Sequence, residues 1–317
     1  MGQFITSITE AIGNTPLLRL DKIKEHLAYD GHIYAKLEHL NPSFSKKDRI
    51  ALGMISCAEK KGLLKPGGTV IEMTSGNTGC GLALVCKAKG YRFICVMSRG
   101  NSIERVKMIA AFGGEVVLVD QAPGAVKGKV SGADMQLVEA HAKKLVAETG
   151  AFFANQFENW DNCVSQEPAA LELWRQSEEK LEVFADFAGT GGTFSGYSKT
   201  LKEQNPNIRA YAVEPQGLGF YKQEMVAGAM HGIQGGGYGK ELTIVDRSLL
   251  DGAVCVSDEE AVMYTRLLAA EEGVFAGFSS GANLAAAVKL LQGVEKGKHI
   301  GIIINDCGLK YMSTDLY

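Results

Sequence analysis

Short apolar runs, each bounded by glycine or by polar turn residues, recur along the chain. Most of them lack the alternation of apolar and polar residues that a half-exposed strand shows, so they are typical of buried parallel strands. The runs are HIYAKLEHL (32–40), GTVIEMTS (68–75), RFICVMS (92–98), GEVVLVD (114–120), VFADFAG (183–189), RAYAVEP (209–215), GAVCVS (252–257) and IGIIIND (300–306).

Segments with helical periodicity lie between these runs, and several of them end in glycine, as helix C-termini do. The segments are 48–64, 78–90, 102–113, 132–150, 193–206, 257–273 and 280–297. Because strands and helices alternate, the predicted fold class is α/β, with parallel sheets covered by helices on both faces. The longest polar, glycine-rich interruption, Gln121–Asp134, is interpreted as a loop or lid.

Length and charge narrow the class of protein. A chain of 317 residues suits two domains, or one large α/β unit, with an ample core. The formal net charge of −3 gives no basic excess that would attract nucleic acid or an anionic membrane. The N-terminal residues lack the pattern of a signal peptide, and no apolar segment reaches the roughly 20 residues that span a bilayer.

The seven cysteines and six histidines are scattered along the chain. No C-x-x-C or H-x-x-x-H pair occurs, so the sequence predicts no metal site. Most cysteines have apolar neighbours, which favours buried or half-buried free thiols in a reducing compartment. The interpretation is therefore a cytoplasmic protein.

Three turns each follow a predicted strand and precede a predicted helix. TSGNTG (74–79) would place backbone N–H groups at a helix start, where a carboxylate or phosphate binds, although an ordinary capped turn also fits. GTGGT (189–193) is typical of a phosphate cradle, without the lysine of a Walker loop or the spacing of a dinucleotide motif. The turn 279–282 by itself indicates only a helix cap.

Two adjacent lysines, Lys46 and Lys47, follow the turn signal NPSFS (41–45). By itself, such a pair is typical of a solvated helix start. A lysine combined with an anion-binding turn, a phosphate turn and a hydroxyl turn suits a cofactor that carries both a phosphate and an aldehyde. Lysine forms a Schiff base with such an aldehyde, so the combination indicates pyridoxal phosphate.

The motifs, in their order, resemble those of the cysteine synthase (O-acetylserine sulfhydrylase) and cystathionine β-synthase family, within the fold-type II pyridoxal phosphate enzymes. They are IGNTPLLRL (12–20), KLEHLNPSFSKKDRIA (36–51), TSGNTG, NQFEN (155–159), GTGGTFSG (189–196) and FSSGA (278–282). The resemblance extends from about Ile12 to about Thr314, which is nearly the whole chain.

The resemblance implies two doubly wound parallel-sheet domains of the tryptophan synthase β-like type, with the cofactor in the cleft between them. Residues 39–151 would form a smaller mobile domain that carries the substrate-carboxylate loop. Residues 1–38 and 152–317 would form a larger domain that carries the phosphate loop. Because the sequence stops at Tyr317, soon after the last family motif, we expect no appended regulatory module.

The resemblance also assigns site residues. Ser45, Lys47 and Arg49 fit the family pattern Ser-x-Lys-x-Arg, which makes Lys47 the Schiff-base lysine and Lys46 a neighbouring cation that would lower the pKa of Lys47. The resemblance further implies that Asn77 hydrogen-bonds the cofactor ring hydroxyl and that Ser279 faces the pyridine nitrogen. The residues that would bind the substrate carboxylate are Thr74, Ser75, Asn77, Thr78 and Gln156. The residues that would bind the cofactor phosphate are Gly189, Thr190, Gly191, Gly192 and Thr193.

The implied activity is β-replacement on a serine- or cysteine-type amino acid through an α-aminoacrylate intermediate, with Lys47 as general base. The leading interpretation is a cysteine synthase that converts O-acetylserine and sulfide to cysteine and acetate. The close alternative is a cysteine β-lyase that releases hydrogen sulfide and forms serine, lanthionine or cystathionine. Serine or threonine dehydration is a weaker alternative, and a non-catalytic binding protein of the same fold is disfavoured by the presence of Lys47.

Several segments depart from the family pattern, so the leaving group and the nucleophile stay open. They are NWDNCVSQEPAALELW (159–174), the stretch PGAVKGKV (123–130), the run after Ile233-Gln234-Gly235, and the turn Asn305-Asp306-Cys307-Gly308. Asp306 could be an acid near the pyridine ring or a turn residue. His231 and Tyr238 could contact the second substrate or lie in a surface loop, and Cys307 is expected to be buried.

The expected partners are small molecules, namely an amino acid and sulfide or a thiol. Neither nucleic acid nor a membrane is expected as a partner. The resemblance implies a homodimer, which the residues themselves do not prove.

Overall fold

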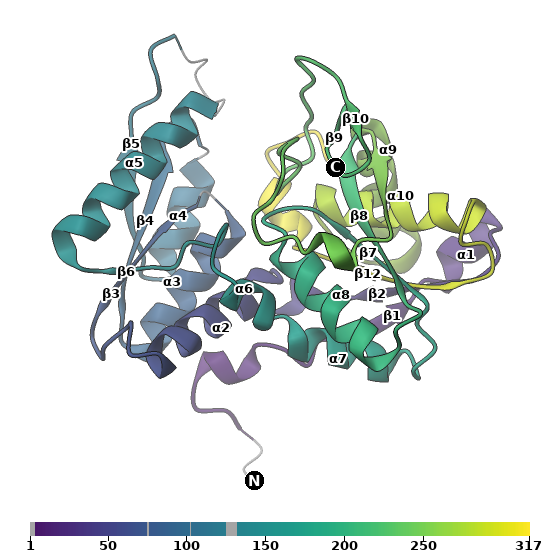
Figure 1. Ribbon diagram of the computed structural model, residues 1–317, viewed down its shortest axis with the longest axis horizontal. Helices are drawn as coiled ribbons and strands as arrows, with labels where there is room; N and C mark the ends of the chain where they lie inside the picture. The colour runs from purple at the N-terminus through teal and green to yellow at the C-terminus, as the bar shows by residue number, and fades with distance from the viewer. Residues whose placement is uncertain (1–3, 75, 102, 125–131) are drawn as a thin grey trace. The chain divides into compact units, whose positions relative to one another are not determined.

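The structure is a computed structural model that describes residues 4–74, 76–101, 103–124 and 132–317 (Figure 1). The central part of the expected loop or lid at Gln121–Asp134 lies outside the described residues, and its last three residues begin a helix. The chain forms two compact units. Unit 1 comprises Met1–Ile12 and Lys47–Ser165, and unit 2 comprises Gly13–Lys46 and Gln166–Tyr317.

These boundaries differ from those implied by the resemblance. Residues 39–46 belong to unit 2, whereas residues 152–165 and the N-terminal segment belong to unit 1. Lys46 is thus the last residue of its segment in unit 2, and Lys47 is the first residue of its segment in unit 1. Which unit is mobile stays a prediction.

Unit 1 is built on a parallel sheet of four strands in the order β5-β4-β3-β6. Alternate residues of β3 and β4 face opposite layers: Val70 and Cys95 pack toward α2 and α3, whereas Ile71 and Ile94 pack toward α5. The elements of this sheet and its helices are β3 (Thr69–Met73), β4 (Arg92–Ser98), β5 (Glu115–Val119), β6 (Phe152–Phe153), α2 (Lys47–Lys60), α3 (Asn77–Lys89), α4 (Ile103–Ala111), α5 (Gly132–Thr149) and α6 (Asp161–Val164).

Unit 2 is built on a six-stranded sheet in the order β1-β2-β12-β7-β8-β11, parallel except for β1. Helices α1, α9 and α10 cover one face, and α7 and α8 cover the other (Figure 1). The elements are β1 (Leu17–Arg19), α1 (Asp21–Leu27), β2 (His32–Lys36), α7 (Glu167–Gln176), β7 (Val183–Phe187), α8 (Gly192–Gln204), β8 (Arg209–Pro215), the hairpin β9 (Leu218–Gly219) and β10 (Glu224–Met225), β11 (Gly252–Val256), α9 (Asp258–Glu272), α10 (Phe278–Gln292) and β12 (His299–Ile303).

The predicted α/β class is confirmed. Each of the eight apolar runs overlaps a strand, and each of the seven periodic segments overlaps a helix, with the start of the element within two residues outside the segment in five cases. The sequence did not predict β1, α1, β6, α6, α7 or the β9–β10 hairpin; all of these except the ten-residue α7 are short. No helix in the described part of the chain is long and apolar enough to cross a membrane.

Candidate active site

The two adjacent lysines lie in different surroundings. Lys47 is half-buried and is the first residue of α2, in unit 1. Its carbonyl oxygen lies so close to α3 that a Cβ added to Gly81 would meet it at 2.9 Å. The residues before it are fixed within unit 2, because Ser45 pairs with Asp306 in a short antiparallel bridge and the Lys46 N–H donates to the Asn305 carbonyl at 2.9 Å.

Lys46 forms a buried ion pair. Its Nζ lies 3.0 and 2.9 Å from the two carboxylate oxygens of Asp186, at the end of β7, and both side chains are almost fully buried. Asn283 of α10 also donates to Asp186, at 3.3 Å. The charge of Lys46 is therefore compensated inside unit 2, and its effect on Lys47 stays a prediction.

The TSGNTG turn leads from β3 into α3, whose N-cap is Gly76 and not one of the hydroxyl residues that the sequence suggested. Thr74 is buried, and its Oγ1 accepts from the Gly76 N–H at 3.3 Å. Asn77 is half-buried at the first position of the helix, and Thr78 is buried at the second. Ser75 lies outside the described residues.

A buried hydrogen-bond chain supports this turn within unit 1. Thr78 Oγ1 donates to Gln156 Oε1 at 2.6 Å, and the Gln156 side-chain and backbone nitrogens donate to the Glu72 carboxyl at 3.5 and 3.2 Å. Burial raises the pKa of Glu72 to about 8, although hydrogen bonds from Gln156 act in the opposite direction. Gln156 and Thr78 were expected from the sequence, but Glu72, two residues before Thr74, was not.

The GTGGT turn leads from β7 into α8 in unit 2. Gly191 is the N-cap, with φ of +96°, and a Cβ there would meet Val245 Cγ2 at 2.4 Å. Since L-residues rarely adopt this conformation and no space exists for a side chain, glycine is required at this point. Thr190, Gly192 and Thr193 are buried around the helix start.

The glycines at 235–237 pack against this turn. A Cβ at Gly236 would meet the Ala188 carbonyl at 2.5 Å, and the Gly237 N–H donates to the same carbonyl at 2.9 Å. This close packing explains why glycine occupies positions 236 and 237. A helix start with backbone amides, glycines and threonine hydroxyls has the donor chemistry that a phosphate needs.

The third turn opens α10, whose N-cap is Gly277, so the two serines that follow do not cap the helix as the sequence suggested. Ser279 Oγ accepts from Asn305 Nδ2 at 3.0 Å, and Ser280 Oγ accepts from the Asn305 N–H at 2.9 Å. All three residues are buried in unit 2. The serines are thereby tied to the turn after β12.

The structure also places the residues whose roles stayed open. Asp306 is buried and accepts from the Tyr311 hydroxyl at 2.5 Å, and Cys307 is buried, as expected. His231 Nε2 lies 2.9 Å from the Gly237 carbonyl, and burial lowers the pKa of this imidazole. Tyr238 is 46% exposed, which agrees with a surface loop.

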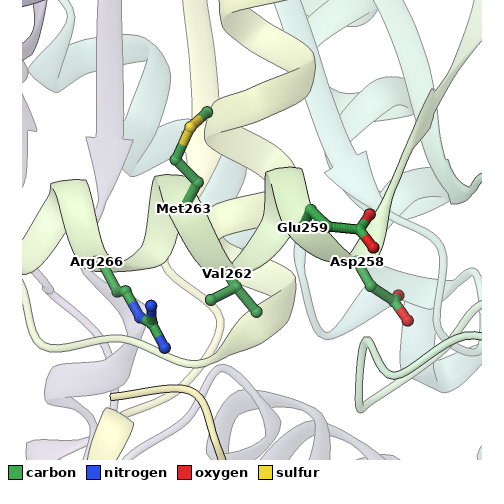
Figure 2. Close-up of a pocket in the computed structure, with 5 residues that line it drawn as sticks. All are labelled: Asp258, Glu259, Val262, Met263 and Arg266. Atoms are coloured by element: carbon green, nitrogen blue, oxygen red, sulfur yellow. The ribbon is translucent and has the colours of Figure 1, made fainter.

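The cysteines are free, and all are buried or half-buried, as the sequence predicted. Among the described residues, no group of three or more His, Cys, Asp or Glu side chains is arranged to hold a metal ion. A separate surface hollow of about 540 Å³ lies along α9 and is lined by Asp258, Glu259, Val262, Met263 and Arg266 (Figure 2). It contains none of the residues implied by the motifs.

Comparison with known families decides the identity of the fold. The family model described as "Pyridoxal-phosphate dependent enzyme" matches residues 8–306. The chain belongs to this family. The glycine-capped turns and the lysine at the start of α2 fit the cofactor, because they provide amide and hydroxyl donors for a phosphate and an amine for its aldehyde.

Individual relatives of this pyridoxal phosphate enzyme are also similar over at least nine-tenths of their length. A protein named cysteine synthase from Staphylococcus aureus is 39% identical over 99% of this chain and 97% of its own. A crystal structure of cysteine synthase from Entamoeba histolytica has 35% identity and a TM-score of 0.91, covering 99% of this chain and 91% of that one. A hydrogen sulfide-producing enzyme from Fusobacterium nucleatum has 36% identity and a TM-score of 0.88, covering 98% and 99%.

Proposed function

We propose that this pyridoxal phosphate enzyme acts as a cysteine synthase, replacing the β-substituent of O-acetylserine with sulfide. The observation that carries the proposal is the 39% identity with the S. aureus cysteine synthase over 99% of this chain. A half-buried lysine at the start of α2 and two glycine-capped turns of anion-binding type support it.

Pyridoxal phosphate, when bound, supplies an aldehyde that forms an imine with amines and a ring that withdraws electrons from the substrate α-carbon. We propose that Lys47 and Asn77 of unit 1, together with Gly189–Thr193 and Ser279 of unit 2, hold it. Amides at the start of α8 would bind its phosphate, aided by the helix dipole. Asn77 would hydrogen-bond the ring hydroxyl.

The substrate carboxylate would lie against Thr74, Ser75, Asn77, Thr78 and Gln156. Because the Thr78 hydroxyl already donates to Gln156, we expect backbone N–H groups at the start of α3 to provide much of the binding. Lys47 would then act as the general base that takes the α-proton and later returns it. Ser279, a neutral hydroxyl, would face the pyridine nitrogen.

Replacement of Lys47 tests the assignment. Borohydride reduction followed by peptide mass spectrometry should find the cofactor on Lys47, and Lys47→Ala should lower turnover by at least about 10²–10⁴-fold because the general base is lost. Lys65→Ala, at an exposed lysine, is the matched control and should keep its activity. Cofactor attached to Lys46 instead would refute the assignment.

The similarity to the hydrogen sulfide-producing enzyme favours a second candidate, a cysteine β-lyase. The two functions differ in the direction in which sulfide moves. With O-acetylserine as donor, a cysteine synthase consumes added sulfide and forms cysteine. Release of sulfide from cysteine alone, without uptake in the first assay, would favour the lyase.

We infer a cytoplasmic homodimer from the motif resemblance and from the free, mostly buried thiols. Sedimentation velocity should give about twice the mass of the 34.0 kDa chain. Cell fractionation should recover the protein with cytoplasmic markers. A monomer at micromolar concentration would contradict the first inference.

A further inference from the structure

Asn305 is held in place by three hydrogen bonds of its own within unit 2. Its backbone N–H donates to Ser280 Oγ at 2.9 Å, its carbonyl accepts from the Lys46 N–H at 2.9 Å, and its side-chain Nδ2 donates to Ser279 Oγ at 3.0 Å. Asn305 and Ser279 are only 5% and 6% exposed. The backbone of Asn305 is therefore held on both sides of the residue, and its side-chain amide contacts Ser279 through Nδ2.

The hydrogen bond from Asn305 Nδ2 limits the direction in which the Ser279 hydroxyl can donate its proton. A serine hydroxyl has one proton to donate and two lone pairs that accept. Because one lone pair of Ser279 is taken by Asn305 Nδ2, the hydroxyl proton must point to a different atom. Within the described part of the chain, no protein acceptor receives this proton, and a buried donor without an acceptor is unfavourable.

A pyridine nitrogen that carries no proton is an acceptor, and it would satisfy this hydroxyl. We propose that Asn305 is a positioning residue that directs the Ser279 hydroxyl proton toward the pyridine nitrogen of bound pyridoxal phosphate and thereby keeps that nitrogen unprotonated. The proposal rests on the proposed placement of Ser279 against the ring. An unprotonated ring withdraws electrons less strongly, which favours β-replacement over transamination.

The reverse amide orientation would have the opposite consequence. With Oδ1 facing Ser279, the serine would donate to Asn305 and would present only a lone pair to the ring, which suits a protonated nitrogen. Asn305→Asp imitates this arrangement, because an ionised carboxylate only accepts. Asn305→Ala removes the contact without adding a charge.

The test uses holoenzyme loaded with pyridoxal phosphate that carries ¹⁵N in the ring, because the ¹⁵N chemical shift reports protonation directly. Wild type should show an unprotonated nitrogen. Asn305→Asp should move the shift toward the protonated value, and Asn305→Ala should weaken cofactor binding about 3- to 10-fold, as expected for one lost hydrogen bond. Asn207→Asp, at an exposed asparagine of unit 2, should change neither quantity.

A double-mutant cycle separates positioning from general stability. If Asn305 acts through Ser279, Asn305→Ala should have little further effect on cofactor affinity in a Ser279→Ala background. A protonated nitrogen in wild type, or an unchanged ¹⁵N shift in cofactor-loaded Asn305→Asp, would overturn the proposal. Wild-type protein with no cofactor on Lys47 would instead refute the proposed function, so the two failures are distinguishable.

Discussion

Glu72 and Asp186 occupy comparable places in the two units but are stabilised differently. Each is a buried carboxyl near the end of an interior strand, β3 or β7, and each precedes a glycine-containing turn. Asp186 is paired with the Lys46 ammonium and an amide of Asn283. Glu72 receives only amide donors among the described residues, and burial raises its pKa to about 8.

The difference shows two ways to keep a buried carboxyl from repelling a nearby anion. In unit 2, the carboxyl of Asp186 is paired with the Lys46 ammonium. Unit 1 favours the neutral acid at pH 7, so the turn proposed for the substrate carboxylate is not opposed by a full negative charge. Asp186 depends on a cationic partner and Glu72 on amide donors, so substitutions at each carboxyl should show which partner stabilises it.

The largest effect is expected at the ion pair. Asp186→Asn or Lys46→Met alone leaves a buried charge without its partner and should lower the free energy of unfolding by about 3–5 kcal/mol. The double substitution should cost clearly less than the sum of the two. Urea unfolding measures all three variants.

The control is the exposed pair Lys143 and Glu139 of α5, whose side chains are 63% and 46% exposed. Breaking this pair should cost about 0.3–0.5 kcal/mol. If Asp186→Asn is as mild as this control, the carboxyl of Asp186 does not depend on Lys46, and the contrast with Glu72 disappears.

A smaller effect is expected at Glu72. Glu72→Ala leaves the Gln156 backbone N–H without its acceptor and leaves Gln156 Nε2 with only the Met73 carbonyl, at 3.4 Å, so it should destabilise the protein by about 1–3 kcal/mol. It should also raise KM for the amino-acid donor more than it lowers kcat, because Gln156 and Thr78 lose their support. Glu72→Gln, which resembles the neutral acid in shape, should retain near wild-type KM at pH 7; an equally large loss would show that the ionised form is needed.

Per pH unit, the smallest expected effect is the change in the free energy of unfolding through the ionisation of Glu72. A carboxyl whose pKa is higher in the folded protein contributes full stability below its unfolded value of 4.5 and loses that contribution as pH rises toward about 8. The free energy of unfolding should thus fall by up to about 1.4 kcal/mol for each unit that the pH rises within this window. Thermal unfolding at several pH values should show a shallower fall for Glu72→Gln than for wild type, whereas Glu139→Gln should give a curve parallel to wild type.

The regular part of the fold was predictable from local patterns. Continuous apolar runs such as RFICVMS and VFADFAG mark interior strands, because both faces of a parallel sheet are covered. The short elements β1, β6 and α6 carry too few residues for a periodic signal. They form because tertiary packing fixes them, which a local pattern does not contain.

The residues near the turns were found by motif, but their supporting partners were not. Lys46 and Asp186 are 140 positions apart, and Ser279 and Asn305 are 26 apart. Such pairs depend on how strands are ordered in the sheet, and neither composition nor spacing reports that order. Glu72 lies only two residues before the start of TSGNTG, yet its burial and its contact with Gln156 appear only in three dimensions.

The strand order of unit 2 has a consequence for synthesis on the ribosome. β12 lies between β2 and β7, although its residues, His299–Ile303, follow all the other strands of this sheet in the chain. The six-stranded sheet therefore stays open in the nascent chain until β12 has been translated, whereas unit 1, which extends to Ser165, is translated earlier. We expect premature termination before residue 299 to leave a folded unit 1 attached to an unfolded remainder that chaperones must shield.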